Sequence, residues 1–373
     1  MASSPDQSLL RKHMPELDVL RGVAILVVVL YHGLYHAGAV SSNRIGQLFI
    51  NLTVFGWLGV NLFFVLSGFL ITGILIDSKG KPDFYHKFYL RRALRILPAF
   101  FAIIVLLVIL HRMSFRTATF SMFFLANYMD TFHLVDAYFP LWSLSVEEQF
   151  YSVWPAIAGN VSVRTLTILS AALCVVEPLL RWFVASGHPS LGDIHMSTYL
   201  IADNLALGAL ASIFARSRFG TLRNGVRVGL ATCAAALVIL FAGLPFGILH
   251  RTNVFGAALQ TLPWNLFFTG TLLLLLGLQS PLFSSVWTAP LRFLGYISYG
   301  LYLIHMLVNT LYRWSVLHIA NTSARNALSG AYTQLILSTA LSILLAWLSR
   351  RFYEEPFLRI GRKPKPAPIR STV

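Results

Sequence analysis

Three side chains that can exchange a proton lie inside apolar stretches of this 373-residue chain: His32, Glu147 and His305. Burying an ionisable group in hydrocarbon costs several kcal/mol, so such residues are rare there and usually functional. Counted at about 1.5 Å per helical residue, they lie roughly 16, 18 and 21 Å from one predicted membrane boundary. We therefore expect the three groups to share one layer of the bundle.

The first apolar stretch carries a polar stripe. Arg21 and His32 are eleven residues apart, about three helical turns, so both fall on one face. Asp18 and His36 extend the same face, and an interfacial Arg21 paired with Asp18 is the structural alternative for that arginine.

Two adjacent carboxylates, Glu147 and Glu148, follow the run Phe139–Val146. Ser145 and Glu148 have the spacing of a capping box, which offers a structural explanation for Glu148. It does not explain Glu147, because adjacent helical residues point about 100° apart.

A basic segment holds Arg92 and Arg95 on one helical face. One interpretation is the usual cluster of basic residues at the cytoplasmic boundary of the membrane. The other is a site for an anionic ligand, because the planar guanidinium group of arginine matches phosphate oxygens. Other intramembrane polar groups have structural interpretations: Glu177 with Arg181 as an i, i+4 pair, Asp203-Asn204 as a bridge between helices, and Ser67-Gly68 as small-residue packing.

The elements that must position these residues are membrane helices. Hydrophobic residues make up 56% of the chain and charged residues only 12%, which excludes an ordinary soluble domain. We expect an all-α polytopic bundle of ten spans. Their predicted ranges are 18–40, 54–76, 96–112, 139–159, 163–185, 196–216, 226–244, 257–279, 291–313 and 331–352. The stretch 117–129 is apolar but too short to cross.

The net charge of +15 is interpreted as topology. Twenty-one lysines and arginines fall on the side of the N-terminus and seven on the other, so both termini are predicted to be cytoplasmic. Residues 1–17 form the N-terminal segment, 18–353 the membrane domain and 354–373 a basic tail. No nucleic-acid signature is present, and Cys174 and Cys233 lack the spacing of a metal site or disulfide framework.

Several motifs occur in an order typical of one family. They are Arg21 and His32, the run Phe63–Phe69, Arg92 with Arg95, Trp142–Tyr151, Tyr296–His305 and Tyr353-Glu354-Glu355-Pro356. Over nearly its whole length the chain resembles the membrane acyltransferase-3 family, which includes O-antigen, exopolysaccharide and macrolide acyltransferases.

The resemblance implies a ten-helix domain in the bacterial inner membrane. It implies a cytoplasmic acyl-CoA donor, expected to be acetyl-CoA, with no bound cofactor or metal. The acceptor would be a hydroxyl of a glycan or glycolipid. Many family members carry a further C-terminal hydrolase-like domain. Since this sequence ends at Val373, we expect transfer to finish in the membrane domain or, alternatively, on a separate extracytoplasmic acyltransferase.

A thioester is already activated, so such an enzyme chiefly needs a general base and good positioning. We expect His32 to take the hydroxyl proton, with Glu147 orienting its ring, or alternatively to carry a transient acyl group. Arg92 and Arg95, with Arg21, Glu148 and His305, are the expected donor- and substrate-binding residues. A glycan transporter or flippase, or a purely structural protein, is the competing interpretation.

Overall fold

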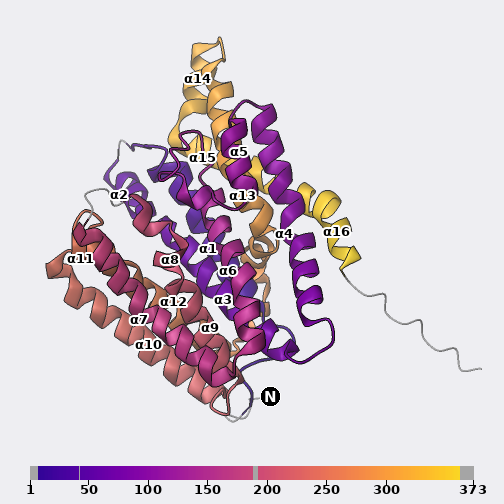
Figure 1. The fold of residues 1–373 in the computed structure, drawn as a ribbon. Helices are drawn as coiled ribbons and strands as arrows, with labels where there is room; N and C mark the ends of the chain where they lie inside the picture. The colour runs from indigo at the N-terminus through magenta and orange to yellow at the C-terminus, as the bar shows by residue number, and fades with distance from the viewer. Residues whose placement is uncertain (1–6, 42, 188–191, 362–373) are drawn as a thin grey trace, which may run out of the picture.

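The structure is a computed structural model that describes residues 7–41, 43–187 and 192–361. These residues form a bundle of helices with one isolated β-bridge, between Ser8 and Thr221 (Figure 1). The α-helices of the first half are α1 (Pro15–Leu30), α2 (Arg44–Leu52), α3 (Leu58–Ser78), α4 (Phe84–Ile109), α5 (Phe115–Met122), α6 (Leu141–Asn160) and α7 (Val163–Gly187). Those of the second half are α8 (Thr198–Ile201), α9 (Asp203–Arg216), α10 (Leu222–Gly243), α11 (Val254–Leu259), α12 (Thr261–Leu278), α13 (Ala289–Leu317), α14 (Thr322–Ser329), α15 (Ala331–Leu348) and α16 (Glu355–Ile360).

Eight helical stretches of the described chain are long and apolar enough to cross a membrane. They are Pro15–Tyr35, Arg44–Ser78, Phe84–Ile109, Val163–Gly187, Leu222–Phe246, Val254–Leu278, Val286–Leu317 and Ala331–Ile360. The all-α polytopic prediction is confirmed. The count of ten spans and the side of each terminus stay predictions.

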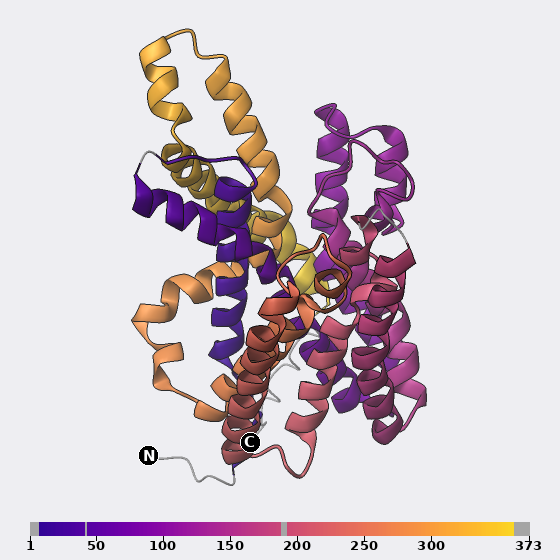
Figure 2. The same cartoon turned by 90° about the vertical axis from the view of Figure 1, so that its left-hand side faces the viewer.

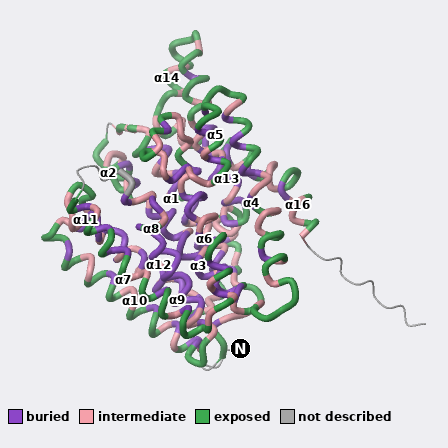
Figure 3. The backbone as a smooth tube through the Cα atoms, viewed as in Figure 1, coloured by how far each residue is buried: buried purple, intermediate pink, exposed green. Residues whose placement is uncertain are grey.

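The two predicted spans missing from these eight correspond to α6 and to α8 with α9. Helix α9 has only 14 residues and is mostly buried, while α6 carries two glutamates. A helix enclosed by other helices needs no lipid-facing apolar surface, so its sequence can be shorter or more polar than a lipid-facing span. The buried centre in Figure 3 contains α3 and α9, and exposed segments of α10 and α14 lie at its periphery.

Large apolar side chains are exposed on the outer helices. Leu237, Val238 and Phe241 of α10 and Leu179 and Phe183 of α7 are examples. So many exposed apolar side chains would be a liability in water but are matched to lipid chains. The protein is therefore a multi-pass membrane protein.

Several predicted cytoplasmic segments lie at one end of the molecule, which we call the basic end. The Leu9 amide donates to Gly220 O, Arg216 pairs with Asp77 at 2.7 Å, and Lys79 donates to the carbonyls of Ala158 and Val161. The N-terminal segment and three connections of the bundle thus meet there. At the opposite end, Figure 2 shows two projections, formed by α4 with α5 and by the α13–α15 region.

Helical structure continues past residue 353, after which the tail was predicted to begin. Residues 349–354 form a π-helical segment that continues α15, and α16 follows it directly. Glu354, which we assigned to the tail, is only 4% exposed and pairs with Arg350 at 3.2 Å. Residues 362–373 lie outside the described part of the chain.

Glycines set the two tightest helix pairings that matter for the site. A Cβ on Gly22 would lie 2.0 Å from Leu291 O, and one on Gly295 would lie 2.1 Å from Asp18 O, so α1 and α13 touch backbone to backbone. Gly68 and Gly208 do the same for α3 and α9. The predicted small-residue packing at Gly68 is therefore confirmed.

Candidate active site

The close packing of α1 against α13 brings two of the predicted residues together. His32 lies at the start of a π-helical turn, Tyr31–Tyr35, that continues α1. Such wide turns are frequent at functional sites. The His32 ring lies 5.0 Å from the His305 ring, centroid to centroid, and both side chains are buried.

Hydrogen bonds between the two histidines specify their neutral tautomers. His305 Nδ1 lies 2.8 Å from Tyr302 O and 3.2 Å from Leu301 O, and because both are acceptors, Nδ1 must carry the hydrogen. His305 Nε2 is then an acceptor, 3.1 Å from His32 Nδ1, so the latter nitrogen is protonated. His32 Nδ1 also lies 3.0 Å from Val28 O.

The remaining nitrogen, His32 Nε2, therefore carries a lone pair. It is buried and has no hydrogen-bond partner within the described residues. Around the His32 ring are the rings of Tyr31, His36 and Phe139, at centroid distances of 5.0, 5.6 and 6.1 Å. An unpartnered imidazole nitrogen can accept a proton from a hydroxyl that comes within hydrogen-bond distance.

Glu147 has neighbours other than the histidines. Its Oε1 accepts a hydrogen bond of 2.6 Å from Ser67 Oγ of α3, and it interacts electrostatically with Arg92 and Arg95. His32 and His305 are paired as one unit, whereas Glu147 belongs to a separate cluster with the arginines. Glu147 and the two histidines were predicted at similar depths in the membrane, but they have different neighbours.

Glu148 follows Glu147 on α6, and its Oε1 is buried without a partner in the described chain. The capping-box explanation fails because α6 begins at Leu141, and Ser145 Oγ donates to Leu141 O inside the helix. Neither glutamate is therefore explained by a helix start.

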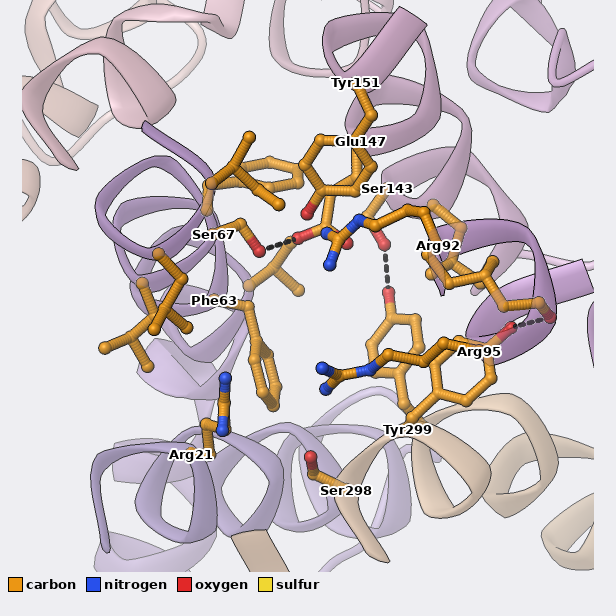
Figure 4. A pocket seen from close by; sticks show the side chains of 18 of the residues that line it. Arg21, Phe63, Ser67, Arg92, Arg95, Ser143, Glu147, Tyr151, Ser298 and Tyr299 are labelled. Atoms are coloured by element: carbon orange, nitrogen blue, oxygen red, sulfur yellow. Dashed lines mark hydrogen bonds between the residues drawn. The ribbon is translucent and has the colours of Figure 1, made fainter. Parts of the chain in front are cut away.

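Three arginines from two helices interact electrostatically with Glu147. Arg21 comes from α1, and Arg92 and Arg95 come from one face of α4, which begins before the predicted third span. Figure 4 shows all three guanidinium groups directed toward a common space. Arg92 stacks 3.8 Å above the Tyr151 ring, and Arg21 also pairs with Asp18 at 3.4 Å, as the structural alternative predicted.

This space is a cavity of about 160 Å³. Its lining includes Arg21, Arg92, Arg95, Glu147 and Ser67. A second cavity of about 550 Å³ lies beside it, and its lining again includes Arg21 and Arg95, together with Arg91 and Arg350. The shared arginines make the two cavities neighbours, with positive charge around both.

Ser143 and Tyr302 separate the first cavity from the histidine pair. Both line the cavity, and their hydroxyl oxygens lie 2.6 Å apart. The Tyr302 ring is 5.8 Å from the His305 ring, centroid to centroid. Tyr302 therefore lies between the arginine-lined cavity and His305, and His305 in turn contacts the candidate base His32.

Several lining residues were not predicted from the sequence. Tyr299 and Tyr302 precede His305 at intervals of three, a spacing that could have marked one helical face of α13. Ser67 was interpreted only as packing, although its hydroxyl binds Glu147. Arg350 was predicted only as one of the basic residues on the cytoplasmic side, and no local pattern in the sequence assigns it to a cavity.

A further group of buried charges forms a cluster apart from this site. Arg181 pairs with Asp203 at 2.8 Å, rather than with Glu177 as predicted, and Glu177 Oε2 accepts from the Asp203 amide at 2.6 Å. Asn204 connects α9 to α3 through Asn61 at 3.3 Å, which confirms the predicted bridge.

Comparison with known proteins places the chain among acyltransferases. The profile of the acyltransferase domain family matches residues 14–351. The peptidoglycan O-acetyltransferase OatA of Listeria monocytogenes is 28% identical over 381 residues, covering 94% of this chain and 57% of OatA. YrhL of Bacillus subtilis is 29% identical over 391 residues, covering 94% of this chain and 56% of YrhL. No solved structure matches the chain.

The chain thus spans little more than half the length of these relatives. The family match, however, extends over nearly the whole of it and includes both the arginine-lined cavity and the histidine pair. The chain belongs to the acyltransferase domain family of membrane proteins.

Proposed function

We propose that this protein transfers an acetyl group from acetyl-CoA to a hydroxyl of a cell-surface glycan, from within the bacterial inner membrane. The observation that carries the proposal is the unpartnered Nε2 of His32, whose partner His305 contacts Tyr302 in the lining of the arginine-lined cavity. The acceptor class follows the name of OatA, a peptidoglycan O-acetyltransferase.

The donor occupies the two neighbouring cavities in this proposal. Coenzyme A carries several phosphates, and arginine forks are suited to them. The larger cavity, with Arg91 and Arg350, takes the nucleotide end, while the smaller one takes the thioester end. Glu147, bound to Ser67, keeps Arg92 and Arg95 directed into the small cavity. Glu148, the next residue of α6, also attracts Arg92 electrostatically.

The histidine pair performs the proton transfer. His32 Nε2 takes the acceptor's hydroxyl proton as the oxygen attacks the thioester carbonyl. The new C–O bond forms, the C–S bond breaks, and the proton passes to the leaving thiolate to give free coenzyme A. His305 Nε2 holds the His32 Nδ1–H throughout, so the charged imidazolium that forms keeps its hydrogen bond.

The layer formed by Ser143 and Tyr302 has to open for this reaction. Tyr302, and His305 behind it, lie between the donor cavity and the base, and Tyr302 is held by a hydroxyl–hydroxyl contact of 2.6 Å with Ser143. A single neutral hydrogen bond contributes only about 0.5–1.5 kcal/mol net, which thermal motion can overcome. The closed arrangement would also keep water away from the thioester when no acceptor is bound.

Thioester consumption by the purified protein tests the proposal. The protein in lipid nanodiscs is mixed with labelled acetyl-CoA and fragments of cell-wall glycan, thiol release is followed, and the glycan is examined by mass spectrometry. We expect thiol release and acetylated glycan in parallel. Glycan movement across a vesicle membrane without any thiol release would instead identify a transporter.

A further inference from the structure

Arg251 is an exposed residue at the end of the molecule opposite the basic end, held by one stacking contact and one hydrogen bond. Helix α10 begins beside Ser8 at the basic end and is 22 residues long, so the loop before α11 lies across the bundle. In that loop, the Arg251 guanidinium carbon lies 4.1 Å above the Trp57 ring. Arg251 Nε donates to Gln260 Oε1 at 2.9 Å, and Gln260 is itself buried and bound to Leu249 O.

The two terminal nitrogens of Arg251 stay available. Among the described residues, Arg251 has no carboxylate within ion-pair distance, and Nε makes its one hydrogen bond. Stacking on an aromatic ring and a fixed Nε leave the planar fork pre-oriented. Such a fork fits a carboxylate or phosphate with two parallel hydrogen bonds.

The surroundings of Arg251 connect it to the candidate base. Its guanidinium interacts electrostatically with the hydroxyl of Tyr31 and with the ring of His195. Tyr31 precedes His32, and their ring centroids lie 5.0 Å apart. Both ring nitrogens of His195 are buried without a partner within the described chain, so additional hydrogen-bonding groups are present beside the arginine.

We propose that Arg251 binds an oxyanion of the acceptor, a carboxylate or a phosphate, and so places the acceptor's hydroxyl beside His32. This inference rests on the proposed function, because it assigns the acceptor's place in that reaction. Arg251 is a positioning residue that selects anionic over neutral glycans. Trp57 and Gln260 hold its fork in place, and His195 supplies bonds to sugar hydroxyls.

The test compares acceptors of different charge. The probes are a neutral oligosaccharide of N-acetylglucosamine, the same oligosaccharide with one lactyl carboxylate per disaccharide, and a polyprenyl-pyrophosphate-linked neutral disaccharide. The variants are Arg251→Gln and Arg251→Lys. The matched control is Arg313→Gln, which removes the same charge from an exposed position near the same end of the molecule.

For Arg251→Gln we expect a rise in KM for the anionic acceptor of about 10- to 100-fold, the loss typical of charge-assisted hydrogen bonds. Its kcat, its KM for acetyl-CoA and its KM for the neutral oligosaccharide should stay near those of the wild type. Arg251→Lys, which keeps the charge and loses the fork, should be intermediate. The anionic probe whose KM rises in Arg251→Gln identifies the oxyanion as a carboxylate or as a phosphate.

Equal KM changes for neutral and anionic acceptors, or none, would overturn the role of Arg251. If the wild type consumes no thioester with any probe, the proposed function fails instead, and binding still decides the role of Arg251. Quenching of tryptophan fluorescence by the anionic oligosaccharide should then be weakened in Arg251→Gln and unchanged in Arg313→Gln. Equal affinity of wild type and Arg251→Gln would contradict the inference.

Discussion

The charged cluster between α7 and α9 and the candidate active site are built from similar residue types but differ in how many polar atoms have partners. In the cluster, Arg181 uses Nε, Nη1 and Nη2 to bind Ala258 O, Leu200 O and Asp203 Oδ2. Arg181, Glu177 and Asp203 are at most 2% exposed. We call this the closed cluster, because its three guanidinium nitrogens all have partners.

The second region, which we call the open site, consists of the arginine-lined cavity and the histidine pair. Arg92 Nε, Glu148 Oε1 and His32 Nε2 are buried without partners in the described residues. A buried polar atom without a partner costs free energy, so each such atom calls for an explanation, such as a ligand or a water molecule that binds there. In our proposal the closed cluster supports the fold and the open site supports activity.

The largest effect expected from breaking the open site comes from His32→Ala. Loss of a general base typically lowers the rate about 100- to 10,000-fold. His305→Ala should cost less, up to about 100-fold, because it misorients the base without removing it. The double variant should be little slower than His32→Ala, since the two residues act as a unit. Single-turnover acetyl transfer by purified variants measures all three rates.

That experiment also separates His305 from Glu147 as the partner of His32. The losses from His32→Ala and Glu147→Gln should combine nearly independently, because Glu147 lies with Ser67 and the arginines. Independent losses for His32 and His305, with non-additive losses for His32 and Glu147, would show that our assignment of the orienting residue is wrong.

Breaking the closed cluster should have the next largest effect, on stability instead of rate. Arg181→Met leaves Glu177 and Asp203 buried without a cation, and removing one partner of a buried ion pair costs about 3–5 kcal/mol. We expect a lower yield of monodisperse protein and a lower unfolding temperature in detergent. The double variant Arg181→Met, Asp203→Asn should recover much of the loss. A wild-type unfolding temperature for Arg181→Met would remove the distinction between the two regions.

Ser67→Ala should have the smallest effect, and it tests how much a single hydrogen bond of the open site contributes to donor binding. It removes the 2.6 Å hydrogen bond to Glu147, while Arg92 and Arg95 still face that carboxylate. A loss of about 0.5–1.5 kcal/mol corresponds to a rise in donor KM of roughly 2- to 12-fold. Donor titration at saturating acceptor measures it. A change in kcat alone would indicate that Ser67 acts on the reaction step and not on donor binding.

The sequence predicts depth well and neighbours poorly. Residue counting along helices placed His32 and His305 in one layer, and the structure pairs them. The same counting placed Glu147 in that layer too. The depth of a residue along its helix, however, does not say which neighbouring helix its side chain contacts. The partner of Glu147 is decided by the contact of α3 with α9 through Gly68 and Gly208, which orients Ser67.

Other differences have equally local causes. The π-helical turn at Tyr31–Tyr35 depends on tertiary packing and has no marker in a hydropathy pattern. The i, i+4 spacing of Glu177 and Arg181 predicted a pair, yet Asp203 of a neighbouring helix binds the guanidinium instead. Local spacing can be overruled in this way wherever a third charged group is buried within reach.

Donor binding by His32→Ala and by the double variant Arg92→Gln, Arg95→Gln tests the central claim most directly. The claim is that arginines bind the donor while histidines carry out the transfer. Calorimetry with a non-hydrolysable acetyl-CoA analogue should give His32→Ala an affinity near that of the wild type. The double arginine variant should bind about 10- to 100-fold more weakly. Equal weakening in both variants, or normal binding by the arginine variant, would contradict the account.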